Sequence, residues 1–192
     1  MKKDIILSGV GGQGILSIAT IIGDAATRAG LNLKQAEVHG MSQRGGEVES
    51  GLRLSDTEIH SDLVPLGSAD IILSMEPMEA LRYLPFLHEG GFVVTSSTPF
   101  KNIDPYPEDR VRAALAGLDR VIALDLDGIT RANAIPQSAN VVLLGAAAGI
   151  IGILSPEQLR ESIRNIFAAK GERVVEMNLK AFEIGREYGG RQ

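Results

Sequence analysis

The sequence predicts an α/β fold with a mostly parallel sheet, and three features support this prediction. An apolar run at residues 5–7 leads through a glycine-rich turn into an apolar, alanine-rich stretch at 15–29. Further short apolar runs alternate with segments that carry helix start and stop signals. The 192 residues are 44% hydrophobic, which suits one domain with a real core. We expect a single domain over 1–192, with an α/β core at 1–135 and C-terminal helices at 138–188.

The turn that organises this fold is Gly9-Val-Gly-Gly-Gln-Gly14, in which the glycines are spaced G-x-G-x-x-G. A strand, a glycine turn and a helix form the context in which this spacing binds phosphate. Glycine permits positive φ and close approach of a ligand, and the helix N-terminus offers free N–H groups and a partial positive charge. The sequence therefore predicts a three-layer, Rossmann-like fold with a phosphate-binding turn. A tight turn without a ligand is the alternative.

The other elements are assigned from apolar runs, glycines and prolines. Strands are expected at 4–9, 36–39, 48–54, 57–63, 69–75, 92–95 and 121–126. Helices are expected at 13–29, 77–84, 107–116, 141–152, 156–170 and 174–188. The runs 48–54 and 57–63 should form a β-hairpin, which would make the sheet mixed. Ser155-Pro-Glu-Gln158 is a helix start with a cap residue and a first-turn proline, and the last two helices should pack as a hairpin.

The expected helix at 141–152 is rich in small residues, which leave one side nearly smooth. One interpretation is close packing on the sheet. The other is an interface for a homodimer, because small residues allow two backbones to approach closely. The sequence leaves both interpretations open.

A second glycine-rich segment, His39-Gly-Met-Ser-Gln-Arg44-Gly-Gly46, is too polar for a helix or strand and is expected to be a loop. It follows the second strand, and ligands of open α/β sheets lie at the carboxyl ends of strands. Arg44 suits a phosphate or carboxylate because guanidinium makes bidentate contacts. The alternative is a surface loop in which Arg44 pairs with Glu47 or Glu49.

Glu37 keeps a dinucleotide-binding role open. An acidic residue about 20 residues past such a glycine turn would hold a ribose 2′-hydroxyl. Glu37 is the only candidate, 23 residues past Gly14. A solvated glutamate at a strand end is an equally good interpretation, and the role of His39 is left open as well.

Composition excludes several classes of function. The chain has no cysteine, so it cannot ligate an iron–sulfur cluster through thiolates, form a disulfide or use a thiol nucleophile. Its net charge of −5 argues against a nucleic-acid binder, which needs a basic surface. The most apolar stretch, Val141 to Leu154, has 14 residues, whereas a membrane span needs about 18. We expect a soluble, cytoplasmic protein that binds neither membrane nor nucleic acid.

No self-contained catalytic set is visible in the sequence. His39, His60 and His88 share no metal-ligand spacing, and the Gly-Lys-Ser/Thr of a P-loop is missing. Asp125-Leu-Asp-Gly128 lacks the later ligands of a calcium loop and is interpreted as an ordinary turn after a strand. We therefore expect no catalytic residue and no metal site, but an anion-binding cleft on a subunit of a larger assembly.

The two glycine-rich segments resemble the gamma-type domain of 2-oxoacid:ferredoxin oxidoreductases, the pyruvate/ketoisovalerate oxidoreductase family. The resemblance is carried by Gly9-Val-Gly-Gly-Gln-Gly14 and by Glu37-Val-His-Gly-Met-Ser-Gln-Arg-Gly-Gly46, and it extends over nearly the whole chain. The segments at 76–87 and 139–145 look like the indolepyruvate branch, whose small beta subunit this chain would be.

The resemblance implies a holoenzyme that decarboxylates a 2-oxoacid on thiamine diphosphate, passes electrons through iron–sulfur clusters to ferredoxin and delivers the acyl group to coenzyme A. The thiamine and cluster sites would lie on a large partner subunit. This chain would bind no cofactor alone, would be inactive alone, and would contribute to assembly and to a coenzyme A cleft. Its candidate cofactor-binding residues are Gly9, Gly11, Gly12, Gln13, Gly14, Ser42, Gln43, Arg44, Gly45 and Gly46.

Two other functions stay open beside this one. An independent NAD(P)-binding oxidoreductase would use Glu37 for the ribose. A purely structural assembly subunit would leave the cleft empty. The sequence does not identify the 2-oxoacid, because the reacting centre would lie on the partner.

Overall fold

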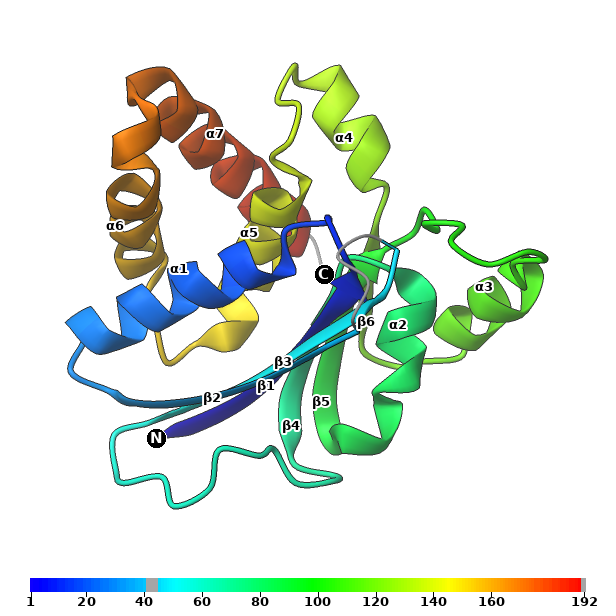
Figure 1. Ribbon diagram of the computed structural model, residues 1–192, viewed down its shortest axis with the longest axis horizontal. Coiled ribbons are helices and arrows are strands. Elements are labelled where there is room, and N and C mark those ends of the chain that lie inside the picture. The colour runs from blue at the N-terminus through cyan, green and yellow to red at the C-terminus, as the bar shows by residue number, and fades with distance from the viewer. Residues whose placement is uncertain (41–44, 191–192) are drawn as a thin grey trace.

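The computed structural model describes residues 1–40 and 45–190, and at its centre is a six-stranded mixed sheet (Figure 1). The strands are β1 Lys2–Val10, β2 Asn32–His39, β3 Glu47–Ser55, β4 Ala69–Ser74, β5 Leu87–Ser96 and β6 Val121–Leu124. Their order is β2-β3-β1-β4-β5-β6. Strands β1, β4, β5 and β6 are parallel, and β3 is antiparallel to both of its neighbours. The predicted mixed, mostly parallel α/β fold is confirmed.

Helices cover both faces of the sheet. They are α1 Ile15–Arg28, α2 Pro77–Arg82, α3 Glu108–Ala116, α4 Leu126–Ala132, α5 Ala139–Ile151, α6 Pro156–Phe167 and α7 Glu172–Gly189. Helices α1 and α5 pack on one face, and α2 packs on the other with α3 beside it. Helices α6 and α7 lie outside α1 and α5 (Figure 1). In the part of the chain that the structure describes, no helix has the length and apolarity to cross a membrane.

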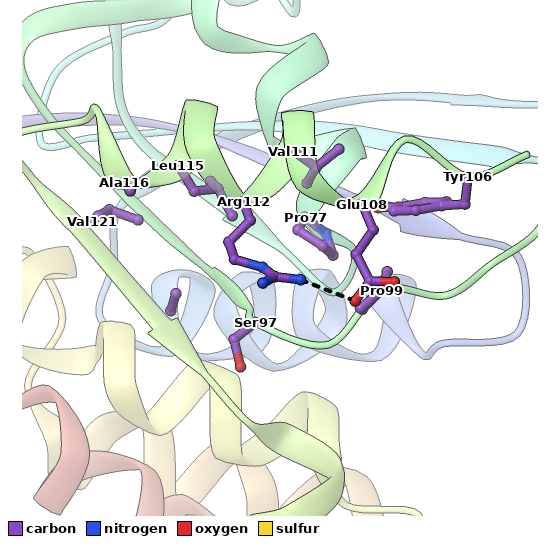
Figure 2. Close-up of a pocket in the computed structure, with 11 residues that line it drawn as sticks. Pro77, Ser97, Pro99, Tyr106, Glu108, Val111, Arg112, Leu115, Ala116 and Val121 are labelled. Atoms are coloured by element: carbon purple, nitrogen blue, oxygen red, sulfur yellow. Dashed lines mark hydrogen bonds and ion pairs between the residues drawn. The ribbon is translucent and has the colours of Figure 1, made fainter.

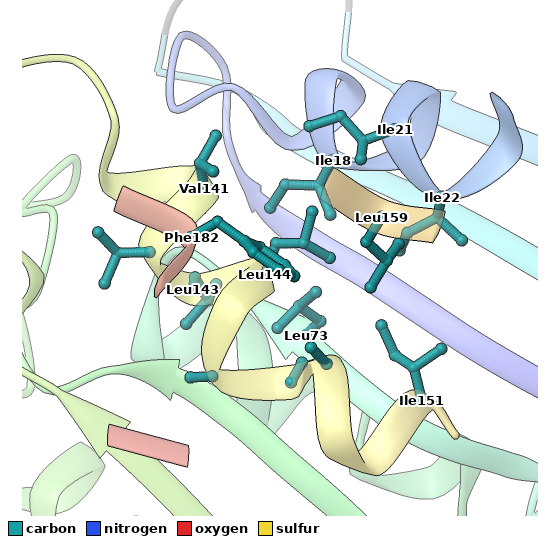
Figure 3. Packing of buried hydrophobic residues seen from close by; sticks show 14 of the residues in the cluster. Ile18, Ile21, Ile22, Leu73, Val141, Leu143, Leu144, Ile151, Leu159 and Phe182 are labelled. Atoms are coloured by element: carbon teal, nitrogen blue, oxygen red, sulfur yellow. The ribbon is translucent and has the colours of Figure 1, made fainter. Parts of the chain in front are cut away.

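The main hydrophobic cluster joins the sheet to the C-terminal helices. Side chains of β1 alternate between the faces, so that Ile5 and Leu7 enter this cluster while Ile6 enters a smaller one under α2. Figure 3 shows Leu73 of β4 beneath Leu144 of α5 and Phe182 of α7. The helices after residue 138 therefore share one core with the sheet.

The predicted β-hairpin between 48–54 and 57–63 is absent. Strand β3 pairs with β2, with Leu33 opposite Leu54, and does not pair with 57–63. Segment 57–63 forms no strand. Two of its carbonyl groups, those of Ser61 and Leu63, accept hydrogen bonds of 3.0 Å from the Arg53 guanidinium. The side chain of Arg53 also binds Asp4 at 2.9 Å, and this buried pair holds the segment below the sheet.

Local capping signals located the helix starts well. Ser155 and Gln158 form the expected capping box at the start of α6, and Pro77 stands in the first turn of α2. The interpretation of Asp125-Leu-Asp-Gly128 as an ordinary turn is wrong. The carboxylate of Asp125 accepts the N–H of Gly128 at 2.9 Å and caps α4, a helix that the sequence did not predict.

Helix α5 is part of the core, so the first interpretation of its small residues holds. Glycines let the backbones of α5 and α7 touch: Gly145 faces the carbonyl of Phe182, and Gly185 faces the carbonyl of Val142. Helix α7 of the same chain therefore covers the side of α5 that carries Gly145. A homodimer through helix 141–152 stays a prediction. The predicted pairing of the last two helices is present, since α6 contacts α7, but α7 packs mainly on α5.

Candidate functional site

The glycine turn between β1 and α1 is the centre of the candidate site. Gly12 and Gly14 have φ of 100° and 84°, which is the left-handed conformation that glycine favours. Gly14 is the N-cap of α1. Among residues 1–40 and 45–190, no acceptor is found for the backbone N–H groups of Gly12, Gly14, Ile15 and Leu16. These donors and the positive end of the helix dipole favour an anion at this point.

Loop 40–46 meets the glycine turn through its last two residues. The N–H of Gly11 donates to the carbonyl of Gly46 at 2.8 Å, and the N–H of Gly45 lies 3.5 Å from the carbonyl of Gly11. The two segments are therefore neighbours, as the sequence predicts from their positions after β1 and β2. The same contact corrects one expectation: Gly11 cannot offer its N–H to a phosphate, because Gly46 already accepts it.

Gln13 has a structural role in the turn. Its Oε1 accepts the N–H of Val10 at 2.8 Å, and its Nε2 donates to the carbonyl of Met75 at 3.3 Å. The amide thus joins the end of β1 to the end of β4. The strand order of the sheet changes direction between these two neighbouring strands, and ligands of open α/β sheets bind at such a point. A side chain at Gly9 would have a Cβ 3.0 Å from Gln13 Oε1. Gly9 and Gln13 therefore shape the turn.

A third loop, residues 97–107, borders the site beside the glycine turn and loop 40–46, and these three segments form the rim of the site. The sequence did not predict a role for this loop in the site. The Nδ2 of Asn102 donates to the carbonyl of Gly45 at 3.1 Å. Farther along this loop, the hydroxyl of Tyr106 donates to the buried carboxylate of Glu76 at 2.6 Å. Burial and this bond raise the pKa of Tyr106. The rule that placed loop 40–46 at the carboxyl edge applies equally to this loop, which follows β5, and could have identified it.

A small cavity lies between the glycine turn, loop 97–107 and the starts of α4 and α5. Its volume is about 70 Å³, and its lining includes Gln13, Met75, Thr98, Phe100 and Ala139. Sites that enclose a drug-sized ligand measure roughly 300–1,000 Å³. This cavity therefore has no room for a nucleotide, and a large ligand could place only a small group against the turn.

A larger, apolar pocket of about 240 Å³ lies beside α3 and the edge strand β6 (Figure 2). Val111, Leu115 and Val121 line it, and an ion pair between Arg112 and Glu108 crosses its mouth at 3.4 Å. Pro99 lines both cavities, so loop 97–107 separates this pocket from the glycine turn. The lining is mainly apolar, and its cationic side chain, Arg112, is already paired with Glu108.

The sheet face under α2 carries acidic groups where loop 40–46 returns to β3. Glu47 accepts a 2.5 Å hydrogen bond from the hydroxyl of Tyr83 and lies 3.6 Å from Arg82, which binds Glu79 at 2.9 Å. Burial and then Glu47 raise the pKa of Tyr83, so its hydroxyl remains a donor. Burial also raises the pKa of Glu49, and Glu47 adds to that effect. These contacts hold the end of the loop.

One sequence candidate, Glu37, lies apart from the glycine turn. Glu37 is exposed on the edge strand β2, and β3 lies between β2 and β1. Because neighbouring strands are about 4.8 Å apart, Glu37 does not stand next to the glycine turn as a ribose-binding residue would. Ser42, Gln43 and Arg44 lie outside the described residues.

The known proteins that this chain resembles agree with the predicted family. The family model described as pyruvate ferredoxin/flavodoxin oxidoreductase matches residues 4–188. Indolepyruvate oxidoreductase subunit IorB of Thermococcus kodakarensis is 39% identical, over 96% of this chain and 95% of that protein. The 2-oxoglutarate synthase subunit KorC of Methanothermobacter marburgensis is 31% identical, over 97% and 96%.

Solved structures show the same fold. The gamma subunit of a keto/oxoacid ferredoxin oxidoreductase from Geobacter sulfurreducens superimposes with a TM-score of 0.72 and 26% identity, over 99% of each chain. A 2-oxoglutarate:ferredoxin oxidoreductase from Magnetococcus marinus gives a TM-score of 0.77 at 22% identity, and this chain covers 31% of that one. The resemblance read from the two glycine-rich segments is confirmed: this chain belongs to the pyruvate ferredoxin/flavodoxin oxidoreductase family.

Proposed function

We propose that this chain is the small subunit of a 2-oxoacid:ferredoxin oxidoreductase, with indolepyruvate as the 2-oxoacid, and that its glycine turn holds a phosphate group of coenzyme A. The relatives that it matches nearly end to end are oxidoreductase subunits, and among them IorB is named for indolepyruvate. Thiamine diphosphate and the iron–sulfur clusters would lie on a large partner subunit, which would pass electrons to ferredoxin. The lack of cysteine agrees with this division of labour.

The observation that carries the coenzyme A proposal is the set of free backbone donors at the start of α1. Gly12, Gly14, Ile15 and Leu16 have no acceptor among the described residues, and such groups at a helix N-terminus bind phosphate. The Magnetococcus marinus structure was solved with coenzyme A and succinyl-CoA bound. The adjoining cavity of about 70 Å³ is too small for the whole molecule, so the partner would bind the remainder. Arg44 would add positive charge.

Gly12 and Gly30 provide a matched test. Both have positive φ, 100° and 72°, and an added Cβ would meet nothing within 4 Å at either position. Alanine would therefore be strained at both positions, and more at Gly12, whose φ lies farther from the left-handed region that alanine tolerates. Gly12 belongs to the turn, whereas Gly30 follows the far end of α1. In the assembled enzyme, Gly12→Ala should raise the KM for coenzyme A about tenfold, which is roughly the loss of one hydrogen bond to a charged group. Gly30→Ala should leave this KM unchanged.

The same experiment separates the other functions. If Gly12→Ala lowers the yield of complex but leaves the KM for coenzyme A unchanged, the chain is an assembly subunit with no ligand at the turn. If Arg44→Ala leaves that KM unchanged in an assembled complex, Arg44 does not belong to the site. Saturable binding of NAD by the purified chain would favour the dinucleotide function instead.

A further inference from the structure

Asn140, in the first turn of α5, reaches the glycine turn from 126 residues away. Its Nδ2 donates to the carbonyl oxygen of Gly14 at 3.1 Å, and the residue is 8% exposed. The same oxygen accepts the N–H of Ser17 at 3.1 Å and that of Ile18 at 3.4 Å. One side chain from α5 therefore holds the backbone atom at which α1 begins.

Gly14 and Asn140 also fit each other sterically. A Cβ on Gly14 would lie 2.7 Å from Asn140 Nδ2 and 3.2 Å from its Cγ. The chain thus needs glycine at this position for its φ of 84° and for the space that Asn140 occupies. Helix α5 has little freedom to move aside, because Gly145 and Gly189 bring its backbone against that of α7.

Because the peptide unit is planar, the hydrogen bond from Asn140 to Gly14 also affects an N–H group at the start of α1. The carbonyl of Gly14 and the N–H of Ile15 belong to one peptide unit, and in a trans unit they point in opposite directions. A hydrogen bond that fixes the oxygen therefore fixes the direction of the Ile15 N–H. That N–H is one of the donors without an acceptor among the described residues.

We infer that Asn140 is a positioning residue for the anion-binding turn: it orients the N–H of Ile15, at the start of α1, toward the phosphate without being required to touch it. The inference rests on the proposed function of the turn. It also assigns α5 and α7 a role in the site, because the rigid contact between these helices sets the place of Asn140.

The test compares two buried asparagines in the assembled enzyme. Asn178 resembles Asn140 in that its Nδ2 donates to a backbone carbonyl, that of Val174, at 2.8 Å and it is 4% exposed; it lies in α7. Asn140→Ala should raise the KM for coenzyme A about tenfold, with kcat at saturating coenzyme A changed less than about twofold. Asn178→Ala should leave this KM unchanged. Hydrogen exchange of the Ser17 and Ile18 amides should accelerate in Asn140→Ala only.

Three comparisons make the result decisive. If those amides exchange at the wild-type rate in Asn140→Ala, the inference is overturned. If Gly12→Ala raises the KM and Asn140→Ala does not, the inference fails and the proposed function stands. If neither variant changes the KM, both fail. The double variant Gly14→Ala/Asn140→Ala should have a KM no higher than Gly14→Ala alone, because the added Cβ already displaces the amide.

Discussion

Glu49 shows how burial of one carboxylate makes stability depend on pH. Burial raises its pKa above the ordinary value of 4.5, and the charge of Glu47 acts in the same direction. A carboxyl group whose pKa is higher in the folded state binds its proton more tightly when folded. Its contribution to stability is therefore present below pH 4.5 and is lost as the pH rises through the folded-state pKa.

Replacing Glu49 by glutamine should raise the free energy of unfolding at neutral pH, because the amide keeps the shape and removes the poorly solvated charge. The gain should shrink as the pH is lowered through the folded-state pKa of Glu49, because the wild-type carboxyl then takes up its proton. Urea unfolding at several pH values measures both effects. Glu58→Gln is the control, since the side chain of Glu58 is 81% exposed. A gain that is independent of pH would contradict this account.

At the scale of elements, the contact between α5 and α7 rests on glycines. An ideal Cβ on Gly185 would collide with the carbonyl of Val142 and lie 3.0 Å from the N of Ala146, and both are backbone atoms. Gly185→Ala should therefore lower the free energy of unfolding by about 1–3 kcal/mol or more. Gly149→Ala is the matched change on α5, where a Cβ meets nothing within 4 Å. It should stabilise the chain by about 0.5–1 kcal/mol. Equal effects of the two substitutions would argue against close packing of these helices.

At the scale of the whole molecule, the chain holds a rim of three loops, and residues 1–40 and 45–190 include no cluster of His, Asp or Glu that could hold a metal ion. Purified alone, it should reduce no electron acceptor in the presence of a 2-oxoacid, because it has no cysteine for a cluster. The co-purified complex should do so, and its partner should carry thiamine diphosphate and iron–sulfur clusters. An acceptor-reduction assay, with the partner alone as the control, measures this. Turnover by this chain unaided would contradict the proposed division of labour.

Most of the fold could be predicted from the sequence because its signals are local. An apolar strand followed by a glycine turn, a serine cap followed by proline, and glycines after helix ends specify their elements with few distant contacts. The same signals led from Gly9–Gly14 and loop 40–46 to the family. The segment 57–63 was assigned wrongly because an alternating apolar pattern does not reveal that Arg53 binds its carbonyl groups.

By itself, the sequence determined the α/β class, the glycine turn between the first strand and the first helix, the lack of thiolate chemistry and the family. Only the tertiary structure decided which strand pairs with β3, that Gly46 occupies the N–H of Gly11, and that Asn102 and Asn140 support the rim. The physical reason is sequence distance. Asn140 and Gly14 are 126 residues apart, and their hydrogen bond exists only because packing of α5 on the sheet brings two helix starts together.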